Sequence, residues 1–229
     1  MKKQVNSTVK AQLIRSASFL FLFSAVCVFS FALGQQPTLA PTLKRNPSGI
    51  PCIPGWSAGP DLPSTGVRMV VVLFSNGKFY AMGGRSMDGV GSDFAHPFEY
   101  DPSTNRWTIK SATYPDNQVS NMACAVLNDT GTDYIYCVGG SAGGQTTATG
   151  RVFRYNPVTD TIDNISAPWP GDTDGITLPG GFAVLNNKLY ILGGFRINTA
   201  MTNQIWEFTP TTNTWVLKNA VLPVARGYT

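Results

Sequence analysis

A pair of adjacent glycines that follows an apolar run occurs three times in this chain at a nearly constant interval. The three runs occupy residues 79–84, 134–140 and 189–194, and their double glycines are 56 and 54 residues apart. Self-similarity at a fixed period of tens of residues is typical of repeat architectures. We therefore expect one structural unit per repeat.

Two further landmarks keep phase with the double glycines. An aromatic residue that opens a turn follows the second glycine by 16, 15 and 14 residues, at Tyr100, Tyr155 and Phe208. A large apolar residue lies seven positions beyond it, at Trp107, Ile162 and Trp215. Because three landmarks recur together in three copies, the pattern indicates a true repeat and not a chance similarity.

Each copy has the pattern of four short antiparallel strands. The first strands are predicted at about residues 69–74, 122–127 and 182–185, and Asn76-Gly77 and Asn186-Asn187 suit two-residue hairpin turns. The second strand should end at the double glycine, where the missing Cβ atoms permit positive φ and close backbone approach. Four strands per period predict an all-β fold, a partial β-propeller with blades at about 68–115, 121–168 and 181–223.

The double glycine, the segment Tyr-Asp-Pro-Ser-Thr-Asn-Arg-Trp at residues 100–107 and the tail Leu222, Pro223 and Arg226 resemble the kelch motif. The resemblance covers residues 56–229 and implies a ring that typically has six or seven blades. Copy two departs from the motif at Ile162, which puts the packing of its outer strand in doubt.

Both ends of the repeat region have the pattern of an interrupted ring. Residues 56–63 match the fourth strand and exit of a blade, which predicts an isolated N-terminal outer strand, and residues 226–229 enter a further first strand. We expect a sequence that is truncated relative to its natural length. A dimer of half-rings is the alternative.

The first 34 residues have the pattern of a secretory signal peptide. Four basic residues precede an apolar run of 17 residues, 17–33, and a small-x-small end before Gln35. An uncleaved anchor is the alternative, since the run is at the lower limit for spanning a bilayer. Residues 35–55 are predicted to be a Pro-rich linker before the propeller at 56–229, and the protein to be secreted or displayed at the cell surface, without membrane insertion after cleavage.

Without the four N-terminal basic residues, 13 basic and 13 acidic residues remain. A neutral domain gives no electrostatic reason to expect nucleic acid as a partner. We expect an unidentified protein or glycan partner instead.

Cys124 and Cys137 are expected to be direct cross-strand neighbours when the copies are aligned on the double glycine. They form either a disulfide, if the compartment is oxidising, or a pair of buried free thiols. Cys52 has no assigned partner. No Cys-x-x-Cys or nearby histidine accompanies these cysteines, so no metal site is predicted.

The sequence offers no catalytic constellation and no cofactor motif. The one histidine, His96, has Asp93 and Glu99 nearby as conceivable partners, but strand alternation places Glu99 on the opposite face. A polar residue at a blade entrance is the plainer interpretation of His96.

Strand alternation assigns the long connections, at 85–94, 141–149, 195–202, 112–121 and 166–180, to one face of the ring. The candidate ligand contacts on this face are Arg85, Arg196, Trp169, Asp172 and Asp174. The structural alternatives are ion pairs for the arginines and packing between blades for Trp169. These features favour an exported binding scaffold. The alternative is part of an extracellular carbohydrate-active enzyme whose catalytic residues lie outside this segment.

Overall fold

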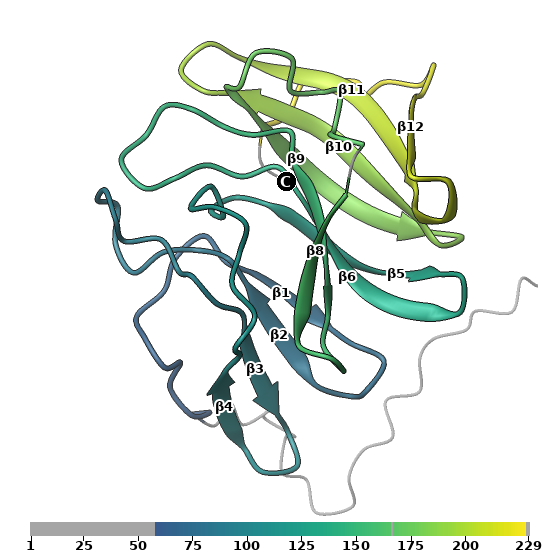
Figure 1. Ribbon diagram of the computed structural model, residues 1–229. Coiled ribbons are helices and arrows are strands. Elements are labelled where there is room, and N and C mark those ends of the chain that lie inside the picture. Colours follow the sequence, from purple (N-terminus) through teal and green to yellow (C-terminus); the bar gives the residue numbers. More distant parts are fainter. Residues whose placement is uncertain (1–57, 166, 228–229) are drawn as a thin grey trace, which may run out of the picture. The chain divides into compact units, whose positions relative to one another are not determined.

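The computed structural model describes residues 58–165 and 167–227 (Figure 1). The predicted signal peptide, the linker and Cys52 lie outside these residues. Within the described part of the chain, no helix is long and apolar enough to cross a membrane.

Three four-stranded antiparallel sheets make up the described fold, and in each sheet the strands follow chain order. The first sheet contains β1 (Val70–Leu73), β2 (Phe79–Met82), β3 (Phe98–Asp101) and β4 (Arg106–Ile109). The second contains β5 (Ala123–Asp129), β6 (Thr132–Val138), β7 (Val152–Asn156) and β8 (Thr161–Ile165). The third contains β9 (Thr177–Leu185), β10 (Lys188–Arg196), β11 (Ala200–Thr209) and β12 (Thr214–Leu217), with the 3-10 turn η1 (Pro210–Thr212) before β12. These sheets are the three predicted blades of an unclosed propeller.

The third blade differs from the prediction at its double glycine. β2 and β6 end before their glycines, whereas β10 continues through Gly193 and Gly194 to Arg196. Gly193 has φ +74°, and the register with β11 shifts there because Asn203 and Gln204 of β11 face this one residue, so the bulge lies in β11 and β10 continues without ending. The predicted long loop at 195–202 is therefore wrong: Arg196 pairs with Ala200 across a tight turn.

The first hairpin turns also differ between copies. Asn186 and Asn187 both have left-handed φ, and Leu185 pairs with Lys188, as predicted for a two-residue turn. In the first blade, Phe74 N–H donates to the Lys78 carbonyl at 2.9 Å, which makes a three-residue loop closed by left-handed Gly77. The two-residue turn predicted at Asn76-Gly77 is wrong by one residue.

The isolated outer strand predicted at residues 56–63 is not formed over its described part. Residues 56 and 57 lie outside the described chain, and residues 58–63 have no strand conformation. A strand needs a neighbouring strand to satisfy its backbone groups. Among the described contacts of this segment, the Pro60 carbonyl accepts a 3.2 Å hydrogen bond from Trp107 Nε1.

The hydrophobic core consists of two clusters, each between neighbouring blades. Tyr80 of the first blade packs edge-on against Tyr155 of the second, with ring centroids 5.9 Å apart. Tyr136 of the second packs against Phe208 of the third at 5.6 Å. Since strand residues alternate between faces, the second blade buries Ile135 on one side and Tyr136 on the other.

The double glycines hold neighbouring blades at a short distance. Gly84 N–H donates to the Val119 carbonyl at 2.9 Å, and a Cβ atom on Gly83 would lie only 2.0 Å from that oxygen. A Cβ on Gly139 would lie 2.6 Å from Cδ of Pro179 in the third blade. Gly83 and Gly139 also have positive φ. The predicted close approach and left-handed backbone are confirmed.

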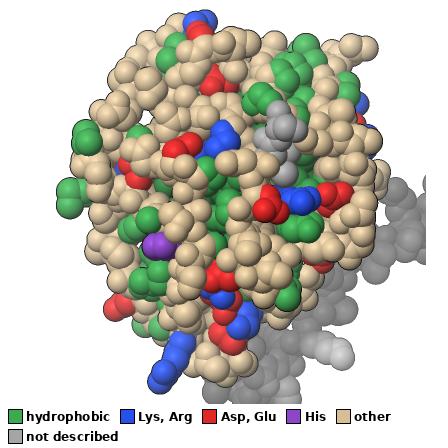
Figure 2. All heavy atoms as spheres, viewed as in Figure 1, with side chains coloured by type: hydrophobic (Ala, Val, Ile, Leu, Met, Phe, Trp, Pro, Cys, Tyr) green, Lys and Arg blue, Asp and Glu red, His purple; other side chains and the backbone are tan. Residues whose placement is uncertain are grey.

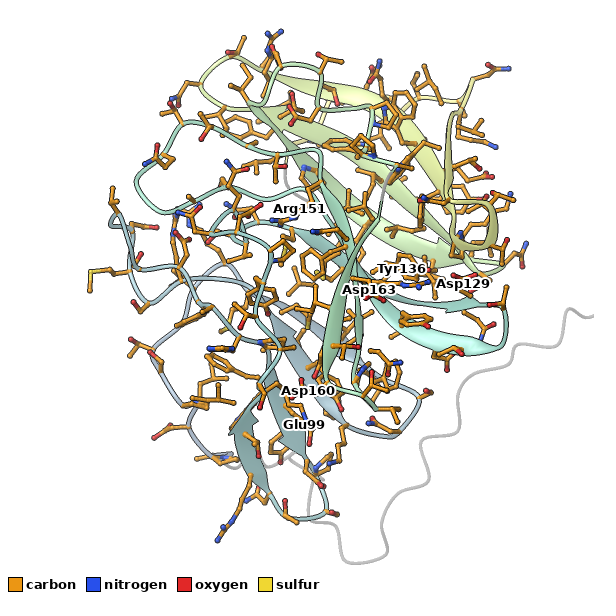
Figure 3. The ribbon with its side chains drawn as sticks, viewed as in Figure 1. Glu99, Asp129, Tyr136, Arg151, Asp160 and Asp163 are labelled. Atoms are coloured by element: carbon orange, nitrogen blue, oxygen red, sulfur yellow. A yellow bond between two sulfur atoms is a disulfide. The ribbon has the colours of Figure 1, made fainter. Side chains whose placement is uncertain are left out.

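A charged cluster lies at the same position of each blade. Glu99 accepts hydrogen bonds from Lys78 at 2.7 Å and from the Tyr80 hydroxyl at 2.9 Å, and Glu207 is held between Lys188 and Lys218. The second blade inverts the charges: Arg154 pairs with Asp129 at 2.6 Å and lies within 3.5 Å of Asp163. Figure 3 labels Asp129 and Asp163 beside Tyr136. The clusters therefore satisfy the charges inside each blade.

Asp160 compensates for the missing tryptophan of the second blade. Trp215 Nε1 donates to the Ala167 carbonyl at 3.1 Å, as Trp107 does to Pro60, but Ile162 has no such donor. Instead the Asp160 carboxylate accepts from Ser111 N–H at 2.8 Å and from Ala112 N–H at 3.3 Å, both in the exit of the first blade. A side chain from the β7–β8 turn thus fastens the second blade to the first.

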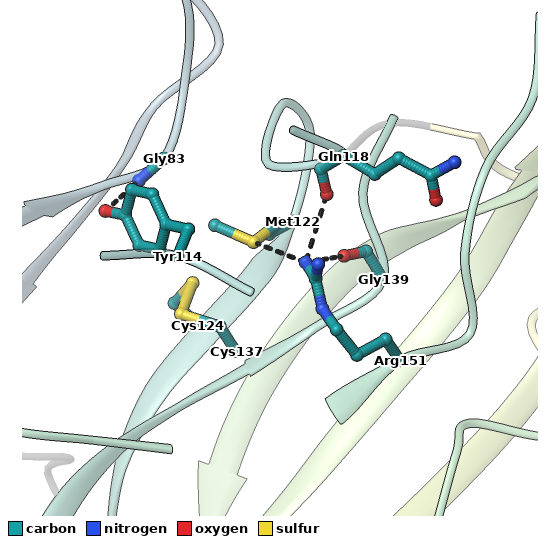
Figure 4. The surroundings of a disulfide bond; sticks show 8 residues. All are labelled: Gly83, Tyr114, Gln118, Met122, Cys124, Cys137, Gly139 and Arg151. Carbon is teal, nitrogen blue, oxygen red and sulfur yellow. Dashed lines mark hydrogen bonds between the residues drawn. A yellow bond between two sulfur atoms is a disulfide. The ribbon is translucent and has the colours of Figure 1, made fainter. Parts of the chain in front are cut away.

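Cys124 and Cys137 lie directly opposite each other on β5 and β6, so the predicted register is confirmed. The structure joins them by a disulfide, with Cα atoms 4.1 Å apart. Tyr114 and Met122 surround this bond in the core between the first two blades (Figure 4). Both cysteines are fully buried, which shields the bond from reductants in the folded state.

We predict that reduction of this disulfide destabilises the domain. The cysteines are 13 residues apart, and closing a loop of that size stabilises a fold by about 3 kcal/mol. Urea denaturation with and without reductant should therefore show a lower free energy of unfolding in the reduced protein. The double variant Cys124→Ala/Cys137→Ala should unfold identically in both conditions. Equal curves for the wild type would contradict the prediction.

We also predict that Asp160→Ala destabilises the domain by about 3 kcal/mol, because it removes inter-blade hydrogen bonds and places alanine at φ 54°. Asp160→Asn should cost less, since asparagine tolerates this conformation and keeps an acceptor. Burial would raise the pKa of Asp160, but the hydrogen bonds from Ser111, Tyr155 and Ala112 together lower it.

The carboxylate of Asp160 therefore contributes stability above the unfolded-state pKa of about 4, which is lost as pH falls through the lower folded-state pKa. The difference in unfolding free energy between wild type and Asp160→Asn should shrink over that range. A difference that stays constant with pH would show that the charge has no such role.

Candidate binding site on the loop face

The long connections gather on one face of the blades, as predicted. They are the β2–β3 connection at 83–97, the β4–β5 connection at 110–122, the β6–β7 connection at 139–151 and the described part of the β8–β9 connection at 167–176. We call this the loop face. The tight β10–β11 turn at 197–199 also lies on this face, whereas the hairpin turns that join the first to the second and the third to the fourth strand of each blade lie at the opposite ends.

A groove of about 390 Å³ lies on the loop face and is lined by all three blades. We call it the central groove. Its polar lining residues are Arg68, Arg85, Asp88, Asn121, Ser141, Gln145, Thr146 and Asn198, and its apolar ones are Leu178, Phe195 and Ile197, with Gly144 between them. Such a mixture of hydrogen-bonding groups and apolar wall is typical of recognition sites.

Two arginines of the central groove converge on one carboxylate. The Arg85 guanidinium donates to Asp88 Oδ1 at 2.6 Å, and Arg68 Nε donates to the same oxygen at 3.2 Å. The hydrogen bond from Arg85, followed by the one from Arg68, lowers the pKa of Asp88. Two arginines and one aspartate give this part of the groove a net positive charge, and the Asp88 side chain is 67% exposed.

The backbone holds both arginines in place. Arg85 N–H and C=O exchange hydrogen bonds with Val67, at 3.1 and 2.9 Å, and its side chain is only 7% exposed. Arg68 has left-handed φ of 60°, an uncommon conformation for a long side chain. Its carbonyl accepts from Asn121 N–H at 3.2 Å, which fixes this conformation against the second blade.

The neighbouring loops are fastened across the blade interface. The Asp93 carboxylate accepts from Gly143 N–H at 2.8 Å and from the Ser120 hydroxyl at 3.3 Å. A Cβ on Gly143 would lie 2.3 Å from the Gly89 carbonyl, so the two loops pack backbone to backbone. The wall of the central groove is therefore formed before any ligand arrives.

The structure separates the predicted contact residues into different places. Arg85 lines the central groove, whereas Arg196 lies in another groove and forms an ion pair with Asp174. Trp169 is 1% exposed and belongs to the core between the second and third blades, which favours its packing role over ligand contact. Asp172 Oδ1 accepts backbone N–H groups of residues 176 and 177, so it shapes the β8–β9 connection.

His96 has a structural partner rather than a catalytic one. Its Nδ1 lies 3.0 Å from the Ala112 carbonyl, and Asp93 is engaged with the second blade. Within residues 58–165 and 167–227, no group of three or more His, Cys, Asp or Glu side chains is placed to hold a metal ion. Figure 2 shows the charged side chains in small groups of both signs rather than in one extended patch.

Sequence reasoning missed Arg68 and Asp88, which complete the charged part of the central groove. Asp88 lies three residues after Arg85 in the same predicted loop, and that spacing was the available signal. Arg68 precedes β1, and its contact with Asp88 across 20 residues depends on the loop path.

Comparisons with known proteins agree with this architecture. The Kelch motif matches residues 67–111 and 120–161. Kelch-like protein 35 of Mus musculus is 30% identical over 159 residues, which are 69% of this chain and 24% of that protein. Kelch-like protein terF of Aspergillus terreus is 26% identical over 183 residues, or 75% of this chain and 37% of that protein. The chain thus spans well under half of these relatives.

The solved structure of YjhT has the same fold, with a TM-score of 0.59, 16% sequence identity, and coverage of 76% of this chain and 57% of that chain. At this identity the likeness concerns the fold alone. The three phased repeats, the three four-stranded sheets and the motif matches together show that the chain belongs to the kelch-repeat family and forms part of a β-propeller.

Proposed function

We propose that this protein is an exported binding scaffold whose central groove receives an acidic segment of a protein partner. Kelch repeats generally mediate protein–protein interaction, and the motif and its relatives support that role here. We propose three things beyond this role: that the central groove is the binding site, that the bound segment is acidic, and that the protein is exported.

The observation that carries the proposal is the shared carboxylate of Asp88. Two guanidinium groups, Arg68 and Arg85, already bind a carboxylate of the chain itself, so the geometry suits the same group on a partner. Arg85 Nε is buried without a hydrogen-bond partner in the described part of the chain. A buried donor of this kind gains from an incoming acceptor.

The remainder of the groove suits a peptide. Asn121, Gln145 and Thr146 offer side-chain hydrogen bonds to a backbone, and Phe195 and Ile197 offer apolar contact. The groove crosses all three blades, so an extended segment would contact residues from each. This arrangement favours a partner with an acidic residue next to apolar ones.

The proposal of export rests on the sequence pattern of residues 1–34 and on the buried disulfide. Structural disulfides persist in oxidising compartments and are rare where thiols are kept reduced. The two observations are independent of each other and favour the same location.

We predict that random peptides displayed on phage and selected on the purified protein are enriched in Asp and Glu. The double variant Arg68→Ala/Arg85→Ala should weaken the selected peptides by at least about ten-fold, since hydrogen bonds to charged groups contribute roughly 1.5–3 kcal/mol. Asp88→Asn should strengthen them, because it removes the competing carboxylate. Arg106→Ala, an exposed arginine of β4 away from the groove, is the matched control.

Two results would contradict the groove proposal. One is a selection without enrichment in acidic residues. The other is equal loss of binding in Arg106→Ala and in the double variant, which would indicate a nonspecific charge effect.

We further predict that the full chain is exported and processed before Gln35. Mass spectrometry of the exported protein should find a mature N-terminus at Gln35, and Leu22→Arg should prevent export by interrupting the apolar run. An intact N-terminus on protein that stays inside the cell would contradict the prediction.

A further inference from the structure

A second groove, of about 420 Å³, lies beside the third blade. We call it the outer groove. One wall is the β8–β9 connection, and the other is formed by the ends of β10 and β11. The polar and aromatic side chains that line this groove are those of Asp174, Thr177, Arg196, Thr202, Gln204 and Trp206.

Comparison of the three blades singles out Trp206. Each of Phe98, Phe153 and Trp206 pairs with the residue two positions before the double glycine, at Ala81, Cys137 and Ile191. The two phenylalanines are at most 4% exposed. Trp206 is larger, only partly buried, and faces an open groove.

The covering residues explain this difference. In the first blade the ring of Phe94 lies 5.0 Å from that of Phe98. In the second blade Tyr114 lies 5.7 Å from Phe153, and the Arg151 guanidinium stacks over the same ring. The residue that corresponds to Phe94 in the third blade is Thr202, since Phe94 N–H bonds the Gly84 carbonyl and Thr202 pairs with Gly194. The second blade also has a threonine there, since Thr149 N–H bonds the Gly140 carbonyl. The third blade differs from the second at Gln204, which stands two residues before the aromatic ring where the second blade has Arg151.

Polar groups lie beside the partly buried ring. Thr202 and Gln204 of β11 line the same groove as Trp206. Trp206 Nε1 donates to Gln204 Oε1 at 3.2 Å, which orients the amide. The amide nitrogen of Gln204 is left to donate to a ligand.

The opposite wall is fixed in advance. A Cβ on Gly171 would lie 2.2 Å from the Trp169 ring, so the connection is folded tightly onto this buried tryptophan. Asp172 fastens its far end to the start of β9. Asp174 and Arg196 form an ion pair at the rim, so their charges cancel. A preformed wall lowers the entropy cost of binding.

We infer that the outer groove binds a neutral saccharide. The C–H face of a pyranose ring carries partial positive charge and stacks on the negative face of an indole such as Trp206. Its hydroxyl groups both donate and accept, which matches the amide of Gln204, the hydroxyl of Thr202 and the paired charges of Asp174 and Arg196. The balanced charge of that pair gives no preference for an ionic ligand. This inference goes beyond the proposed peptide binding and does not depend on it.

The test is binding of the mature protein to an array of immobilised neutral oligosaccharides of gluco, galacto and manno configuration, followed by titration with the best binder. We expect binding to at least one of them. Trp206→Ala and Gln204→Ala should each weaken it by about ten-fold. Trp206→Phe should retain most of the affinity, because it keeps an aromatic face.

Gln204 is exposed, so Gln204→Ala keeps the test valid even if Trp206→Ala impairs folding. Arg68→Ala/Arg85→Ala should bind the saccharide as the wild type does, which separates the outer groove from the central one. Either of two results overturns the inference. One is that no neutral oligosaccharide binds. The other is that Gln204→Ala, Trp206→Phe and a folded Trp206→Ala all bind as tightly as the wild type.

Discussion

The closeness of neighbouring blades at the double glycines is the constraint on which the rest of the structure depends. The Gly84 amide bonds the Val119 carbonyl of the next blade at a distance that leaves no room for a Cβ on Gly83. This contact sets the spacing at which the Tyr80–Tyr155 pair meets and the sulfur bridge is enclosed. A side chain there would separate two sheets rather than disturb one turn.

Alternation and repeat phase predicted what lies within a blade. They gave the strand order, the opposition of Cys124 and Cys137 and the turn at Asn186-Asn187. They did not predict the three-residue turn before Lys78 or the bulge opposite Gly193, because hairpin loops and bulges of different length share the same residue types. Alternation carries no information on the path of a loop, which explains why the pair of Arg68 and Asp88, both outside the strands of the first blade, was missed.

Differences between the three copies show which positions of a blade tolerate substitution. Glu99 and Glu207 share a position that Arg154 occupies with reversed charges, and each is matched by neighbours of opposite sign. The second blade loses the tryptophan of its outer strand at Ile162 and gains the Asp160 anchor. In both cases a change in one residue is balanced by another that it touches, so the sheet is preserved. Trp206 differs, because the third blade has Gln204 where the second blade stacks Arg151 on the ring, and the larger ring of Trp206 is only partly buried.

The continuation of β10 past its double glycine connects this change to both grooves. Since the strand continues past Gly194, residues 195 and 196 alternate in direction, and Phe195 lines the central groove while Arg196 lines the outer one. In the first blade, a loop follows the glycines at this position and returns Phe94 over the aromatic ring. The third blade has a tight hairpin instead, and Trp206 is only partly buried. Extension of one strand by a few residues thus removes a covering loop and gives the two grooves a common wall, so a ligand in either groove would contact the same strand.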